Sequence, residues 1–160
     1  MFDALFTTTT EYKKLSHALS GKGACALFGL PASGRAQMYA ALCRQLDKPL
    51  CIVTPGEAEA TRFAADLNTL RIPAAVFPAR DYVLRPIEGT AREYEYRRLA
   101  VLGELVGGRL RAVAVPAEAL TQFTTPKEDF CANTRTLHAG DTLLRDDLLA
   151  ALFGAGYPRR

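Results

Sequence analysis

Residues 28–37, FGLPASGRAQ, carry two glycines at the separation found in phosphate-binding loops. Gly29 and Gly34 fit the pattern G-x-x-x-x-G, and the loop stands between an apolar run and a helical pattern. In such a loop, backbone N–H groups at the start of a helix hold phosphate oxygens. The sequence therefore predicts a degenerate phosphate loop made of Gly29, Ser33, Gly34, Arg35 and Ala36.

Two positions of this loop lack the groups that nucleotide hydrolysis needs. Arg35 stands where a lysine ammonium would reach the phosphates, and Ala36 stands where a hydroxyl would hold Mg²⁺. The strands expected later in the chain end in Thr-Pro, Phe-Pro and Val-Pro, so none of them supplies a carboxylate. We predict no catalytic residue and no metal ligand in this chain.

A second copy of the glycine pattern serves as a control. Gly103 and Gly108, in GELVGGR, have the same spacing and are also followed by an arginine, Arg109. This copy ends a helical pattern and leads into an apolar run, so its N–H groups cannot converge on an anion. The order of elements around the first loop is therefore what distinguishes it.

Apolar runs alternate with helical periodicity along most of the chain, which predicts a parallel sheet flanked by helices. Strands are expected at residues 24–28, 50–54, 74–78 and 111–116, and helices at 11–19, 35–46, 55–70, 91–106 and 117–123. Thr54 and Glu57 have the spacing of a capping box at the start of the third of these helices.

The pattern changes after Thr124. TTPKED reads as a domain boundary, residues 133–138 as an alternating strand, and residues 145–153 as an amphipathic helix. No partner element for this helix follows before Arg160, so we expect the chain to cut through a second, α+β domain.

The composition is that of a soluble globular protein, with 49% hydrophobic and 23% charged residues among 160. No apolar stretch is long enough to cross a membrane and no secretory signal is present, so we expect a cytoplasmic protein without membrane contact. A net charge of +3 is too small to indicate nucleic-acid binding by itself. Cys25 and Cys51 fall in expected strands, so we expect them to be reduced and packed.

Several blocks taken together resemble the N-terminus of bacterial transcription-repair coupling factor, a family similar in turn to the excinuclease B subunit. The match extends from about Ala24 to Tyr157. The blocks are FGLPASGRAQ, PLCIVTP, VFPARDY, REYEYRRLAVLGEL, VAVPAEAL and LHAGDTLLRDDLLAALFGAGY. Each block is weakly specific alone, whereas their order and spacing together are more specific.

The resemblance implies an α/β fold of the P-loop NTPase (RecA-like) class over residues 1–130. Residues 131–160 would then begin the inserted domain that recruits the excinuclease A subunit, truncated here. The parent family implies an ATP-dependent DNA translocase that displaces stalled RNA polymerase, with ATP and Mg²⁺ at other domains and no cofactor in this fragment. Excinuclease A would bind mostly through residues beyond this chain, and RNA polymerase and DNA through the parent protein.

One feature of the excinuclease B relative is not expected here. That relative grips damaged DNA with an aromatic-rich hairpin after the third strand, but the matching stretch, ARDYVLRPIEGTAREYEY, is too short for such a hairpin. Tyr82, Tyr94 and Tyr96 are therefore expected to serve helix packing and the surface.

Two other functions stay open at this point. The chain could be a self-contained nucleotide- or phosphate-binding enzyme with an atypical loop, in which case Asp81 and Glu88 are the nearby acidic residues. It could also be a nucleic-acid-binding module. The basic residues that this would use are Arg80, Arg85, Arg92, Arg97 and Arg98.

Overall fold

A computed structural model describes residues 7–21, 24–80, 93–155 and 157 of the chain. The chain divides into two compact units, residues 1–122 and 123–160. This division falls between Gln122 and Phe123, close to the change of pattern at Thr124 and before the expected domain boundary at residues 130 and 131.

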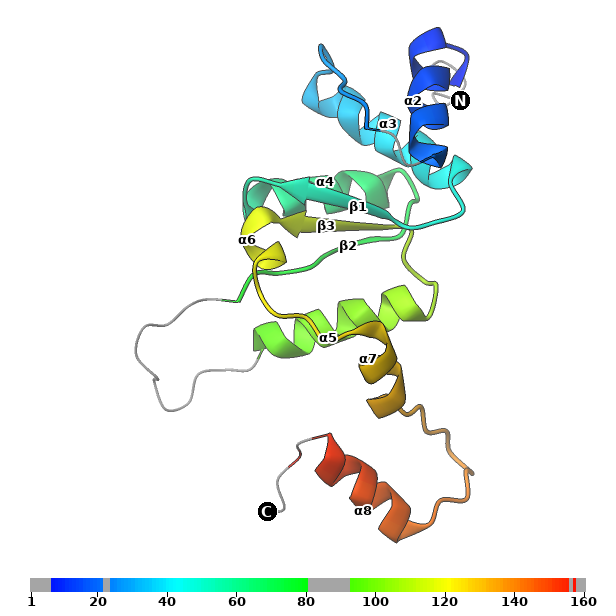
Figure 1. Ribbon diagram of the computed structural model, residues 1–160, viewed down its shortest axis with the longest axis vertical. Helices are drawn as coiled ribbons and strands as arrows, with labels where there is room; N and C mark the ends of the chain where they lie inside the picture. Colours follow the sequence, from blue (N-terminus) through cyan, green and yellow to red (C-terminus); the bar gives the residue numbers. More distant parts are fainter. Residues whose placement is uncertain (1–6, 22–23, 81–92, 156, 158–160) are drawn as a thin grey trace, which may run out of the picture. The chain divides into compact units, whose positions relative to one another are not determined.

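The first unit contains most of the regular structure (Figure 1). Its elements are α2 (Thr10–Ser20), α3 (Ala32–Gln45), β1 (Leu50–Thr54), α4 (Glu57–Thr69), β2 (Ala74–Val76), α5 (Glu93–Val106), β3 (Ala112–Pro116) and α6 (Ala117–Leu120). The second unit contains α7 (Lys127–Asn133) and α8 (Arg145–Gly154). None of the described helices is both long and apolar enough to cross a membrane.

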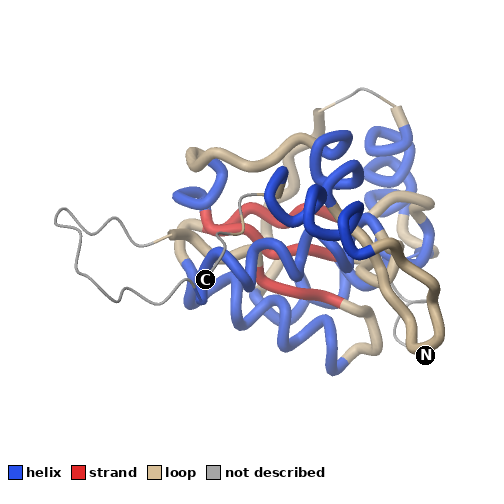
Figure 2. Tube along the Cα trace, turned by 90° about the horizontal axis from the view of Figure 1, so that it is seen from below, coloured by secondary structure: helices blue, strands red, loops and turns tan. Residues whose placement is uncertain are grey.

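The sheet of the first unit consists of three parallel strands in the order β1-β3-β2. In the register, Ala114 of β3 lies opposite Ile52 of β1 and Val76 of β2. Every residue of β3 is buried, as its unbroken apolar sequence predicts for a central parallel strand. Helices lie on both sides of the strands (Figure 2), which confirms the expectation of a parallel sheet flanked by helices.

Hydrophobic clusters on both faces hold the helices on the sheet. On one face, α3 and α4 pack against the strands in two clusters, which bury Ala60, Phe63, Ala64 and Leu67 of α4 along one helical stripe. On the other face, α5 packs against β3 in a third cluster. The buried members of this third cluster are Phe77, Ala79, Val101, Val113, Val115 and Ala119.

The strand expected at residues 24–28 is not formed. The segment has no strand conformation, all five residues are exposed, and the Phe28 side chain is 88% exposed. A strand is stable only where a neighbour satisfies its backbone N–H and C=O groups, and β1 pairs in the described structure only with β3. A short apolar run cannot show whether such a neighbour exists. The full strand order of a RecA-like fold is therefore not confirmed.

The strand expected at residues 133–138 is also not formed. Asn133 instead ends α7, and residues 134–138 are exposed and outside regular structure. Polar and apolar residues do alternate here, but the described residues of this unit contain no strand with which the segment could pair. The helix expected at residues 145–153 is present as α8, although none of its residues is buried.

Arg111 attaches the end of α3 to the start of β3. Its guanidinium donates to the carbonyl of Cys43 at 2.6 Å and also to the carbonyl of Leu46, and the Cys43 thiol donates to the Arg111 carbonyl at 3.5 Å. The last carbonyls of a helix have no partner within the helix, and a cation is favourable at that end. Arg111 therefore fixes where α3 lies along the sheet.

The cysteines differ from the expectation. Cys43 is buried, and burial raises the pKa of its thiol, so the group stays protonated and can act as a donor. Cys25 and Cys51, expected to be packed, are both exposed. Cys25 lies in the segment that forms no strand. Cys51 lies on the same face of the sheet as Val113, where the α5 cluster includes residues of β3 but none of β1; partial burial still raises the pKa of its thiol.

Replacing Arg111 with methionine is expected to lower the free energy of unfolding by about 2 kcal/mol, because two helix-end carbonyls lose a charged donor. Methionine keeps the aliphatic part of the side chain. Urea denaturation followed by circular dichroism measures the change. Arg109→Met is the control: Arg109 binds Glu104 at the surface at 2.7 Å, so its removal should matter far less. Equal losses in the two variants would contradict the role given to Arg111.

Candidate functional site

The local backbone structure explains why both positions of the predicted phosphate loop are glycine. Gly29 adopts a φ of +85°, a conformation that side chains with a Cβ rarely adopt. A Cβ on Gly34 would lie 3.3 Å from the Cδ atom of Pro31, so the turn at Leu30 and Pro31 packs closely on this glycine. The spacing G-x-x-x-x-G therefore follows from a tight helix entry and is not by itself a sign of phosphate binding.

Helix α3 begins earlier than the sequence indicates. Its first residue is Ala32 rather than Arg35, with Pro31 as the N-cap, so Ser33 and Gly34 lie within the first turn. The backbone N–H of Arg35, expected to face an anion, donates to the Pro31 carbonyl at 3.0 Å. Among the backbone N–H groups of the predicted phosphate loop, the one at Arg35 is thus used within the helix.

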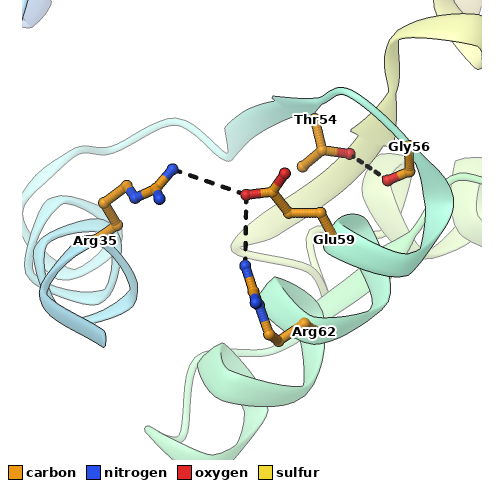
Figure 3. Close-up of polar contacts among 5 residues, drawn as sticks. All are labelled: Arg35, Thr54, Gly56, Glu59 and Arg62. Atoms are coloured by element: carbon orange, nitrogen blue, oxygen red, sulfur yellow. Dashed lines mark hydrogen bonds and ion pairs between the residues drawn. The ribbon is translucent and has the colours of Figure 1, made fainter. Parts of the chain in front are cut away.

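The Arg35 side chain points across to α4, as Figure 3 shows. Its Nη1 atom lies 3.7 Å from Oε1 of Glu59, and the same oxygen lies 3.5 Å from Nη2 of Arg62. The Arg35 and Arg62 guanidinium groups also lie over the Phe63 ring, at 5.9 and 5.8 Å from its centre. Glu59, Arg62 and Phe63 therefore form a small charged and aromatic cluster that holds Arg35.

The electrostatics of this cluster favour a structural role for Arg35. Glu59 lies in the first turn of α4, where the positive end of the helix dipole stabilises a carboxylate. Glu59 is 27% exposed and Arg35 is 42% exposed, so solvent weakens the pair and its contribution to stability is modest. A phosphate at the loop would nevertheless have to compete with Glu59 for this guanidinium.

Ala36 belongs to the hydrophobic core. It is 3% exposed and packs in the cluster that contains Ala40, Ile52 and Phe63. A hydroxyl at this position would therefore enter an apolar environment rather than reach a metal ion at the loop. The sequence showed that the hydroxyl was missing, and the structure shows that the position faces the sheet.

The end of β1 offers no metal ligand either. Thr54 is 2% exposed, and its hydroxyl donates to the Gly56 carbonyl at 2.9 Å (Figure 3). The capping box expected from Thr54 and Glu57 is wrong, because α4 begins at Glu57 with Gly56 as its N-cap. Within the described ranges, no group of three or more His, Cys, Asp or Glu side chains could hold a metal ion.

The residues of the alternative functions fall into two sets. Asp81, Glu88, Arg85 and Arg92 lie outside the described residues, as does Tyr82, so the functions that depend on them stay predictions. The described arginines bind neighbouring groups. Arg80 pairs with Glu95 at 3.3 Å, Arg97 pairs with Glu93, and Arg98 donates to the Pro78 carbonyl at 2.8 Å and lies 4.1 Å from the centre of the Phe77 ring.

Arg80 and Arg98 form part of a polar junction that follows the carboxyl ends of β2 and β3. The Gln122 side chain accepts from the Arg80 N–H at 2.7 Å and donates to the Arg80 carbonyl at 2.9 Å, and it also accepts from Arg98. Since carboxylates, carbonyls and an aromatic ring already engage these side chains, the described part of this surface is not a row of uncompensated cations.

A curated protein is similar in sequence to this chain: the transcription-repair-coupling factor of Bacillus subtilis (strain 168), 26% identical over 135 residues. The resemblance expected from the sequence blocks is confirmed. The aligned part is 83% of this chain and 12% of the relative, so the chain spans about an eighth of the relative's length. No protein-family model and no solved structure matches the chain.

Replacing Ala36 with threonine is expected to lower the free energy of unfolding by about 2 kcal/mol, because extra volume and a hydroxyl enter a packed apolar cluster. Ser33→Thr is the matched control, since Ser33 is exposed in the same helix and should tolerate the larger side chain. Urea denaturation compares the two variants with the unmodified chain. A neutral Ala36→Thr variant would show that this position has room for the hydroxyl of a working phosphate loop.

Proposed function

We propose that this chain is a non-catalytic module of a DNA-repair protein of the transcription-repair coupling factor type, and that it acts as a scaffold for partner recruitment and autoinhibition. The sequence similarity supports a role related to DNA repair. The proposal that the module is non-catalytic rests on the degenerate loop, where Arg35 pairs with Glu59 and Ala36 is buried in the core.

The chemical reason is the loss of charge stabilisation. Phosphoryl transfer depends on a metal ion and on cations that contact the phosphates as charge moves between them. At this loop the lysine is replaced by an arginine that already binds a carboxylate, and the metal-binding hydroxyl is replaced by a buried methyl group. The loop therefore has the glycine spacing of a phosphate-binding loop without the groups that would perform the reaction.

The wider activities belong to the proposed parent protein. In this proposal the parent translocates on DNA with ATP and Mg²⁺ bound at other domains, and contacts RNA polymerase there. Residues 131–160 would begin the domain that recruits the excinuclease A subunit. The apolar side chains exposed on and just after α8 support this part, since Phe153 is 50% exposed and Tyr157 is 59% exposed.

The purified chain is expected to hydrolyse no ATP above background in the presence of Mg²⁺, and the double variant Arg35→Lys/Ala36→Ser is expected to remain inactive. The two substitutions restore residue types but neither the preceding strand nor a second metal ligand. Phosphate release measures turnover, with an active P-loop ATPase as the positive control. Turnover by either form, or Mg²⁺-dependent changes in the amide NMR signals of residues 29–36 on addition of ATP, would contradict the proposal.

The repair role is tested in cells of the source organism. Removing the gene that encodes this chain is expected to slow lesion removal from the transcribed strand more than from the non-transcribed strand. Strand-specific mapping of lesions after ultraviolet irradiation measures both rates, and restoring the gene is the control. Equal rates on the two strands would mean that the similarity does not extend to transcription-coupled repair.

A further inference from the structure

A cavity of about 570 Å³ lies between α2 and α3. The residues that line it do not belong to the glycine loop. Its lining includes Lys13, Ser16, His17 and Ser20 of α2, and Arg44 and Gln45 near the end of α3. This volume is in the range of small-molecule sites. The sequence did not single out these residues, because they come from two helices and form no motif.

The cavity exists because of how the two helices pack. Tyr12 and Leu15 of α2 are buried against Met38, Ala41 and Leu42 of α3. The adjoining stripe of α2, at positions 13, 16, 17 and 20, repeats with the helical spacing i, i+3, i+4 and i+7 and lines the cavity with polar groups. Packing of the apolar stripe therefore holds the polar stripe opposite the end of α3.

The cavity wall carries a basic residue from each helix. Lys13 comes from α2, with the His17 imidazole one turn further along, and Arg44 comes from α3. Nη2 of Arg44 donates to the Leu70 carbonyl at 2.7 Å, so a phosphate in the cavity would share this guanidinium with that carbonyl. None of the described residues that line the cavity is acidic.

Neutral polar groups complete the lining. Ser16 is only 7% exposed, and its carbonyl accepts from the Ser20 hydroxyl at 2.9 Å, which orders the α2 side of the cavity. Gln45 adds an amide group from α3. An amide donor beside basic side chains suits an oxyanion that accepts several hydrogen bonds at once.

We propose that this cavity binds a small organic phosphate, with the phosphate group between Lys13, His17 and Arg44. A doubly charged tetrahedral phosphate matches this wall better than a carboxylate, because it accepts bonds from more directions and interacts with more than one cation. The volume exceeds that of inorganic phosphate, so the remaining space takes the organic part of the ligand. The proposal concerns binding alone and does not depend on the proposed repair function.

NMR titration of the ¹⁵N-labelled chain without Mg²⁺ tests the proposal, with inorganic phosphate, pyrophosphate and ADP as the probes. Saturable shifts are expected for the amide signals of residues 13–20 and 41–45, and ADP is expected to bind more tightly than inorganic phosphate. Lys13→Gln should weaken ADP binding about tenfold, as the loss of one charged hydrogen bond implies.

Lys14→Gln is the matched control, because Lys14 is exposed on the same helix and does not line the cavity. It should change the ADP affinity less than about twofold, and thermal unfolding of the two variants should agree with that of the unmodified chain. Equal weakening by both variants would indicate non-specific attraction to a basic surface and would overturn the proposal.

Three other outcomes would also overturn it. These are the absence of saturable shifts with all three probes, shifts confined to residues 29–35, and binding of a short DNA duplex at the cavity without binding of any small phosphate. The last of these would assign the surface to nucleic acid. Shifts confined to residues 29–35 would instead place the anion at the glycine loop. The proposed lack of ATP hydrolysis would still be tested separately, by phosphate release.

Discussion

The attachment of α3 to the sheet through Arg111 determines where the other features of the first unit lie. One guanidinium satisfies carbonyls at the end of α3 from a position just before the central strand. The residues it joins are more than 60 positions apart in the chain. Because a helix is rigid, fixing its end also fixes the direction of its first turn, where the two glycines and Arg35 lie. The same end of α3 contributes Arg44 and Gln45 to the cavity against α2.

The glycine loop shows how the spacing G-x-x-x-x-G can have structural reasons. Gly29 provides a positive φ and Gly34 a close contact with Pro31, and both properties are needed for the chain to enter α3 tightly. Arg35 meanwhile binds Glu59 and lies over Phe63, so its charge links α3 to α4. With Ala36 in the core, four of the five predicted loop positions, Gly29, Gly34, Arg35 and Ala36, have a structural role in the first unit.

Much of this arrangement could be predicted from the sequence, and the reasons are local. The buried stripe of α4, the unbroken apolar run of β3 and the helix α8 appear where their periodicity places them, since each depends on nearby residues. The amphipathic pattern expected for α8 does not produce a buried face, since none of its residues is buried. The absence of the lysine and of the hydroxyl from the loop can also be read directly from the sequence. The resemblance to transcription-repair coupling factor came from the order of several short blocks, and the comparison with the Bacillus subtilis protein confirmed it.

The sequence by itself determined which residues can take part, through their chemical types and their spacing along single elements. Only the tertiary structure decided that residues 24–28 form no strand, that Arg35 meets Glu59, and that Lys13 and Arg44 line one cavity. Each of these outcomes depends on which distant segment supplies a partner for a backbone edge, a charge or a helix face. The physical reason is that hydrogen bonds, ion pairs and packing act over a few ångströms in space, whereas spacing in the sequence constrains only residues on the same element.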